Sequence, residues 1–206
     1  MLAVIAVIIL ILVVVLKLNS GNESDKKWWE GDFQLWKYFH SDTRQFHVHI
    51  DKCRNPLLSG KLQLPKREYP GLIGANVFKG FNGLTHVELD EYTTRIGNET
   101  FMDCTNLEVV DTGEGVKIIN DKAFMECRNL KKLTLGFRLK QIGYSSFAGC
   151  PNIEEIHSLN TTPPELYESS LADVDKKKCK LYVPLNAIDK YKSAYHWKDF
   201  DQIIAE

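Results

Sequence analysis

A repeat of 23 residues runs through the middle of this chain and restricts it to a small set of folds. Phenylalanine recurs at this interval at four positions, and three further apolar columns keep the same step. Only ten residues in the chain are phenylalanine, so the shared interval predicts a solenoid of stacked coils. The four columns are Phe78, Phe101, Phe124 and Phe147; Ile73, Ile96, Ile119 and Ile142; Leu84, Leu107, Leu130 and Ile153; and Val87, Val110, Leu133 and Ile156.

One unit, residues 119–135, shows how a single coil folds. Its tail reads Leu-x-x-Leu-x-Leu, which predicts a strand with Leu133 facing the core and Lys132 facing solvent. A second short strand is expected at residues 139–142, and residues 122–127 have room for about one helical turn. Such a coil buries its apolar side chains only when neighbouring coils stack on both of its sides.

Two small polar columns follow the same period. Cys104, Cys127 and Cys150 are interpreted as buried free thiols that fill a narrow slot, with a disulfide or a metal site as the alternatives. An asparagine precedes the leucine column in three units, where its amide is expected to satisfy backbone groups of a tight turn. These asparagines are Asn106, Asn129 and Asn152.

The units starting at Ile96 (IGNETFMDCTNL) and Ile142 (IGYSSFAGCPNI) resemble the BspA-like class of leucine-rich repeats. The resemblance extends from about Leu57 to Ile204, because Trp197 and the Leu-Tyr-Val-Pro stretch are similar to the end segment of that class. It implies a β-rich solenoid with short helical turns, display at the cell surface, and binding of proteins or adhesion. It names no ligand, because fold does not determine function.

Four segments are expected along the chain. A hydrophobic signal or anchor segment occupies residues 1–18, and a linker with an N-terminal aromatic region occupies 19–56. The leucine-rich-repeat solenoid of about four coils covers 57–160, and residues 161–206 form a C-terminal capping segment. In that cap, residues 181–183 are expected to form a strand, and Asn186 to cap a helix that seals the stack. The helix would carry Ile188, Tyr191, Ala194 and Tyr195 on one side, with ligand binding by these aromatics as the alternative.

Residues 2–16 contain only Leu, Ala, Val and Ile. As a helix this run spans about 24 Å, slightly less than the roughly 30 Å of a bilayer core. It predicts export, with the repeats displayed at the cell surface or anchored outside the cytoplasm. No small-x-small pair follows the run, which favours a retained membrane anchor over a cleaved signal peptide. A buried N-terminal strand or helix is the alternative, disfavoured by the polar stretch 19–27.

Charge and motifs exclude several classes of function. The net charge is −1, with 26 basic and 27 acidic residues, which is atypical of a nucleic-acid binder. No nucleophile elbow, zinc-protease helix or phosphate-binding glycine loop occurs, so no enzymatic activity, cofactor or small-molecule substrate is expected. If an enzyme site exists, it lies before residue 57, in a pocket around His40, His47 and His49. His47 and His49 share a strand face and could hold a metal, but we expect an exposed polar face and no metal site there.

A protein-binding face is predicted on the outward positions of the main strands. Its area over four strands is only about 250 Å², against about 800 Å² per partner in a standard interface. Flanking loops, the N-terminal aromatics or many anchored copies would then have to contribute. The partner would be a host or envelope protein; the alternatives are a solvated face without function and a structural subunit of an envelope complex. One column is His86, Val109, Lys132 and Glu155, and the other is Glu88, Asp111, Thr134 and His157. Glu108, Lys131 and Glu154 lie beside them, and together these residues make the face mildly acidic.

Overall fold

The computed structural model describes residues 26–40 and 44–206. The predicted export segment, residues 2–16, lies outside this part of the chain. Within the described residues, no helix has the length and hydrophobicity that a membrane crossing requires.

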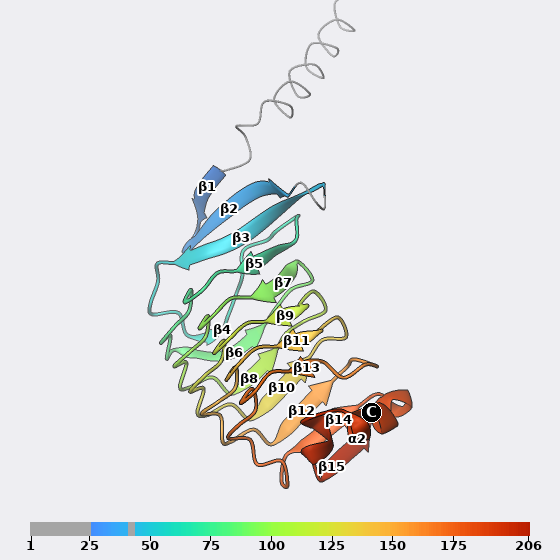
Figure 1. Cartoon of the computed structure of the whole chain (residues 1–206). Coiled ribbons are helices and arrows are strands. Elements are labelled where there is room, and N and C mark those ends of the chain that lie inside the picture. Colours follow the sequence, from blue (N-terminus) through green and yellow to red (C-terminus); the bar gives the residue numbers. More distant parts are fainter. Residues whose placement is uncertain (1–25, 41–43) are drawn as a thin grey trace, which may run out of the picture.

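The chain winds between two sheets that run the length of the molecule (Figure 1). Sheet A has eight strands: β1 Lys26–Glu30, β2 Phe33–His40, β3 Gln45–Cys53, β5 Gly71–Ile73, β7 Thr93–Ile96, β9 Ile118–Ile119, β11 Gln141–Ile142 and β13 Glu165–Leu166. Sheet B has seven strands: β4 Gly60–Lys61, β6 Leu84–Glu88, β8 Val109–Asp111, β10 Lys132–Leu135, β12 Glu155–Ser158, β14 Lys180–Val183 and β15 Gln202–Ala205. Each coil contributes one short strand to each sheet, which confirms the predicted solenoid.

The solenoid has about seven turns, more than the four expected from the phenylalanine column. The additional strands are β4 before the first regular unit, and β14 and β15 after the last one. They pair in parallel with their neighbours although their segments lack the full repeat motif. Parallel pairing requires only backbone hydrogen bonds and an alternating buried face, so the sheet continues where the 23-residue pattern stops.

The repeated apolar columns form continuous ladders in the core between the two sheets. Phe78, Phe101, Phe124 and Phe147 have no exposed surface, and adjacent rings stack with their centroids 5.1 Å apart. The isoleucine column is fully buried as well. Leu133 and Leu135 are buried and Lys132 is exposed, as the alternation of that strand predicted.

The segment 122–127 forms two successive hydrogen-bonded turns instead of one continuous helical turn. The Met125 amide donates to the Lys122 carbonyl at 3.1 Å, and the Cys127 amide donates to the Phe124 carbonyl at 3.3 Å. Lys122 and Glu126 adopt left-handed backbone conformations, with φ of 56° and 62°. These two residues interrupt the right-handed backbone that a helix needs.

The left-handed position at Glu126 recurs in the four regular units and leads to a stability prediction. Gly80 and Gly149 occupy it in other coils with φ of 73° and 74°, whereas Glu126 carries a Cβ atom there. Replacing Glu126 by glycine is expected to raise the free energy of unfolding by about 0.5–1 kcal/mol, because it removes left-handed strain. Urea denaturation measures the change. The control is Glu126→Ala, which loses the same exposed ion pair to Arg128 but keeps the Cβ; equal effects of the two changes would contradict the strain argument.

An antiparallel sheet of β1, β2 and β3 covers the N-terminal end of the solenoid. It is joined to sheet A by a parallel contact between β3 and β5, with Ile50 opposite Ile73. Leu35 and Ile50 are buried against the first coil. This aromatic region is therefore part of the folded body, where it covers the end of the first coil.

The C-terminal cap differs in detail from the expectation. Asn186 caps no helix: it lies inside the 3-10 helix η1, Leu185–Ala187, and no side chain caps the helix α2, Ile188–Ser193. Tyr195 follows α2 and is 75% exposed, so it does not share the buried side of that helix. The proline at position 184 precedes the 3-10 turn, and after this turn the helix starts one residue later than expected.

Two large side chains of the cap cover the end of the stack, Tyr191 of the expected set and Trp197 outside it. Tyr191 and Trp197, the latter in the 3-10 helix η2 (Trp197–Asp199), are at most 1% exposed. The Trp197 indole donates to the Pro164 carbonyl at 2.7 Å. The Tyr191 hydroxyl contacts the Ser158 hydroxyl at 2.7 Å. The cap thus covers the last coil with two large rings whose polar atoms are hydrogen-bonded.

Candidate functional site

The two predicted outward columns lie side by side on sheet B. His86 pairs with Val109, Val109 with Lys132, and Lys132 with Glu155. The second column is also in register across the same four strands, from Glu88 through Asp111 and Thr134 to His157. All eight side chains are exposed or partly exposed. The structure therefore brings the predicted residues together on one face of the solenoid.

Three further strands extend these columns beyond the predicted set. On the N-terminal side, Lys61 of β4 pairs with His86. On the C-terminal side, the columns continue through β14 and β15, with Lys180 and Gln202 in one and Tyr182 and Ile204 in the other. Sequence reasoning missed these positions because their segments lie outside the regular 23-residue units, although the Leu-Tyr-Val alternation of β14 did indicate a strand.

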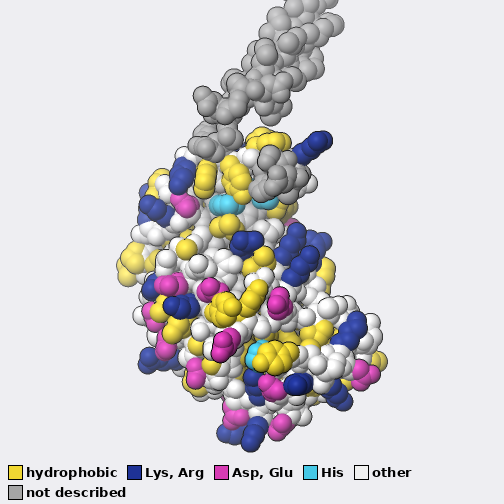
Figure 2. Space-filling model, in the orientation of Figure 1, with side chains coloured by type: hydrophobic (Ala, Val, Ile, Leu, Met, Phe, Trp, Pro, Cys, Tyr) yellow, Lys and Arg dark blue, Asp and Glu magenta, His cyan; other side chains and the backbone are white. Residues whose placement is uncertain are grey.

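The added strands change the charge balance of the face. Across the two extended columns, Lys61, Lys132 and Lys180 stand against Glu88, Asp111 and Glu155. Lys61 pairs with Glu88, and Lys132 lies 3.8 Å from Glu155. Figure 2 shows basic and acidic side chains interspersed over the visible surface. The face is thus mixed in charge, whereas the eight predicted residues and their neighbours alone suggested a mildly acidic one.

His157 is the most confined side chain of the face. Its ring stacks on Tyr182 with the centroids 4.5 Å apart, and its Nδ1 atom lies 2.9 Å from a Glu206 carboxylate oxygen. Its Nε2 atom lies 3.3 Å from Glu155. Asp111 has a structural role, because its carboxylate accepts a hydrogen bond from the Gly113 amide at 2.8 Å. These two residues are therefore poor choices for mutations that must leave the fold intact.

The cysteine column is buried, as predicted, and its thiols donate to backbone carbonyls. Cys104 Sγ lies 3.1 Å from the Phe78 carbonyl oxygen, and Cys127 and Cys150 make the equivalent contact at 3.2 Å. Each thiol therefore links its coil to the preceding one. Burial raises the pKa of Cys104 to about 12 and holds that of Cys127 well above its usual value.

Raised pKa values predict a loss of stability in alkali. Burial also raises the pKa of Cys179 to about 12, so an unfolded chain releases both thiol protons near pH 9 and the folded chain does so only near pH 12. The free energy of unfolding is expected to fall between these pH values, by up to about 1.4 kcal/mol per thiol and pH unit. Urea denaturation at pH 8 and pH 10.5 measures the fall. The double variant Cys104→Ala, Cys179→Ala is expected to show a smaller difference in the free energy of unfolding between the two pH values. An unchanged difference would contradict the attribution of the fall to these two thiols.

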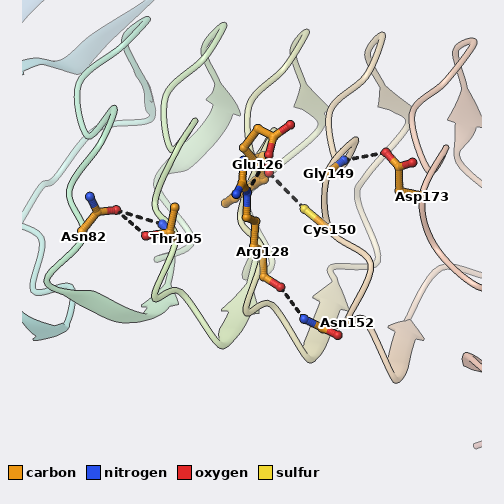
Figure 3. Close-up of polar contacts among 9 residues, drawn as sticks. Asn82, Thr105, Glu126, Arg128, Gly149, Cys150, Asn152 and Asp173 are labelled. Carbon is orange, nitrogen blue, oxygen red and sulfur yellow. Dashed lines mark hydrogen bonds and ion pairs between the residues drawn. The ribbon is translucent and has the colours of Figure 1, made fainter.

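Asparagine side chains connect neighbouring coils, as Figure 3 shows for Asn82 and Asn152. The Asn152 amide donates to the Arg128 carbonyl at 2.7 Å, and the Asn106 amide donates to the Asn82 carbonyl at 2.9 Å. The Asn82 side-chain oxygen accepts from both the amide and the hydroxyl of Thr105. The structural interpretation of Asn106 and Asn152 is confirmed, whereas Asn129 contacts the side chain of Asn106 at 3.5 Å.

The two histidines of β3 lie on the outer face of sheet A, away from the columns of sheet B. His49 packs edge-on against Tyr38 with the centroids 4.7 Å apart, and also against Trp36. Burial and the nearby His47 lower the pKa of His49 to about 4, so the ring is neutral at pH 7. The side chain of His40 lies outside the described part of the structure. Among the described residues, no cluster of three or more metal-ligating side chains occurs.

A pocket of about 790 Å³ lies at the N-terminal end of the solenoid. Its walls come from β2, β3, the segment 61–69 and the segment 88–92. Lys61 and Glu88 belong both to this pocket and to the outward columns of sheet B. The pocket is therefore continuous with the predicted binding face, and nothing in the sequence repeat indicated it.

A family model described as the BspA-type leucine-rich repeat region matches residues 71–191 in six copies. Among solved structures, the Treponema pallidum leucine-rich repeat protein TpLRR is similar, with a TM-score of 0.62 and 19% identity over 88% of this chain and 83% of that one. A Bacteroides capillosus leucine-rich repeat protein has a TM-score of 0.52 and 20% identity over 64% and 97% of the two chains. A leucine-rich repeat protein from Bacteroides ovatus has a TM-score of 0.51 and 23% identity over 77% of this chain and 41% of that one. No curated protein matches the chain.

Proposed function

Because the chain belongs to the BspA-type leucine-rich-repeat family, we propose that it is a non-enzymatic protein-binding module at the cell surface. The binding face is the outward side of sheet B, with the eight residues of the predicted columns at its centre. The partner is another protein, of the host or of the cell envelope. The observation that carries the proposal is the in-register pair of open columns across β6, β8, β10 and β12.

The size of the face supports a modest affinity. Seven strands, each about four residues long, give roughly 440 Å² of flat sheet. A stable interface needs about 800 Å² per partner, so the partner must also cover a flank of the solenoid. Glu108 and Lys131, which pair at 3.2 Å beside the columns, provide such a flank. Display of many copies on one surface would add avidity.

The mixed polarity of the face favours reversible binding over permanent assembly. None of the large hydrophobic side chains that are exposed in the described residues belongs to the eight predicted positions. Obligate interfaces are more apolar than this. The second candidate, a structural subunit of an envelope complex that docks through the solenoid, would therefore have to use another surface, and exposed Trp29 and Phe39 lie near the N-terminal end.

A double substitution on the face tests this proposal. Val109→Arg with Thr134→Arg places two long cations at the centre of sheet B, where no hydrogen bond between described side chains is broken. The matched control is Ile118→Arg with Gln141→Arg, which pair on the outer side of sheet A. The full chain, immobilised at high density, is exposed to host matrix proteins and, separately, to envelope extract.

We expect the sheet B variant to lose its bound protein and the sheet A variant to retain it. Retention by both variants would show that sheet B is not the binding face and would favour the structural-subunit role.

Export is part of the same proposal, with residues 2–16 as the anchor. Surface labelling of intact cells and N-terminal sequencing of the mature chain test it, and a chain found only inside the cell would contradict it.

A further inference from the structure

The first coil has an unusually long connection from sheet B to sheet A. Residues 62–70 join β4 to β5, whereas residues 89–92 join β6 to β7 and 112–117 join β8 to β9. A longer connection cannot follow the same tight path as its neighbours. It bulges outward, and the pocket of about 790 Å³ lies between it, the antiparallel cap and the next coil.

The pocket has an apolar floor and a polar rim. Leu35, Val48, Leu62 and Leu89 line it and are nearly or fully buried. Trp28, Leu64 and Tyr69 widen this apolar surface. Its volume is within the range of ligand pockets, about 300–1,000 Å³. The rest of its lining is polar and includes several charged side chains.

Arg67 in this connection is the one charged residue among the buried residues of the described chain. Its side chain has no exposed surface, and its Nη2 atom donates to Asp90 and to the Thr93 hydroxyl, both at 2.5 Å. The Nε and Nη1 atoms have no acceptor among the described residues. Burying donors without acceptors is costly, by about 1–3 kcal/mol per group, so a residue of this kind requires an explanation.

We infer that this pocket binds a small carboxylate with an apolar body. The acid would accept hydrogen bonds from the free donors of Arg67, and the apolar body would cover the leucine and valine floor. Four cationic residues of the lining stand against three acidic ones, which leaves a net charge of +1; they are Lys37, Lys61, Lys66 and Arg67 against Glu68, Glu88 and Asp90. The carboxylate belongs either to a free amphiphilic acid or to the C-terminus of a peptide, because both present the same chemistry.

Access to the Arg67 nitrogens requires a small outward shift of the connection. Leu62 donates to the His86 carbonyl, and the Pro70 carbonyl accepts from Val48. Between them, residues 63–69 make no backbone hydrogen bond with the described chain. The segment is also held by the Arg67 contacts to Asp90 and Thr93 and by packing of Tyr69 on Phe46. Its shift breaks no sheet pairing, because its backbone makes no hydrogen bond to the described residues.

The Nε–H group of Arg67 reports binding directly. In the ¹⁵N-labelled full chain its resonance is assigned by its loss in Arg67→Lys and is followed during titration with 4-phenylbutyrate. The matched ligand is 4-phenylbutyramide, which has the same shape without the charge. We expect a saturable shift with the acid, and binding of the amide to be about tenfold weaker or more. Equal effects of acid and amide, or no shift with either, would overturn the inference.

Two variants separate loss of the pocket from loss of the fold. Leu64→Trp enlarges a side chain of the pocket lining and is expected to abolish the shift while the thermal unfolding curve stays unchanged. Leu57→Trp, at a position that is 84% exposed and outside the pocket, is expected to bind as the original chain does. Binding that survives Leu64→Trp would place the acid elsewhere and overturn the assignment.

The tripeptide Gly-Gly-Phe, with a free or an amidated C-terminus, distinguishes the two sources of the carboxylate. Tighter binding of the free tripeptide than of 4-phenylbutyrate assigns the site to a protein C-terminus, and the reverse order assigns it to a free acid. This experiment needs no protein partner. A negative result here would therefore leave the sheet B proposal standing. That proposal is tested separately, by capture of a protein partner on the Val109→Arg, Thr134→Arg variant.

Discussion

Replacing Phe124 by alanine is expected to lower the free energy of unfolding by about 3–5 kcal/mol. The ring is fully buried and stacks between Phe101 and Phe147, at 5.1 Å from each. Its removal leaves a cavity in the middle of the ladder, where coils on both sides depend on the contact. Urea denaturation followed by circular dichroism measures the loss.

Phe124→Leu is the matched control, because it keeps an apolar side chain while removing the ring. It is expected to cost clearly less than the alanine change. In a solenoid each coil contacts only its neighbours, so the alanine variant is also expected to unfold over a broader range of urea. A loss of less than about 1 kcal/mol for Phe124→Ala would mean that the coils collapse onto the cavity, contrary to a rigidly stacked ladder.

Replacing Trp197 by alanine is expected to cost about 3–5 kcal/mol and to open the C-terminal end of the solenoid. The indole is 1% exposed, stacks against Phe200 and donates to the Pro164 carbonyl at 2.7 Å. Its loss removes a large buried surface and leaves that carbonyl without its donor. Thermal unfolding measures the stability, and hydrogen exchange of β14 and β15 locates the effect.

Tyr195→Ala is the control for this change, because Tyr195 lies in the same cap but is 75% exposed. We expect it to alter the free energy of unfolding by less than about 0.5 kcal/mol. The hydrogen-exchange result separates sealing from general destabilisation. If β6 and β8 lose protection as much as β14 in Trp197→Ala, the cap does not act locally, and the interpretation as an end seal is wrong.

The inward columns and the polar ladders followed from the sequence alone. The phenylalanine and isoleucine columns, the buried thiols and the linking Asn106 and Asn152 each repeat at the same interval, so one local pattern describes every coil. The outward columns followed from the same alternation. Whether those columns bind a protein remains a proposal, because exposure on a sheet is a consequence of the pattern and carries no information about a partner.

The sequence failed where the structure depends on contacts between segments that do not repeat. Asn186 fits the composition of a helix cap, but the 3-10 turn after Pro184 places it elsewhere. Lys122 and Glu126 permit a helical turn by propensity, yet the path of the chain between coils requires left-handed backbone there. The strands β14 and β15 extend sheet B through backbone pairing, which constrains side chains less than core packing does.

By itself the sequence determined the solenoid, its period and the residues that face inward, because burial in a stacked repeat imposes the same apolar side chains on every coil. The tertiary structure decided the number of turns, the charge balance of sheet B and the pocket around Arg67. Each of these depends on how one irregular segment meets a distant one. Arg67 shows the difference most clearly: in the sequence it is an ordinary residue of a connection. Only the fold buries its side chain, against Asp90 and Thr93 of a neighbouring coil.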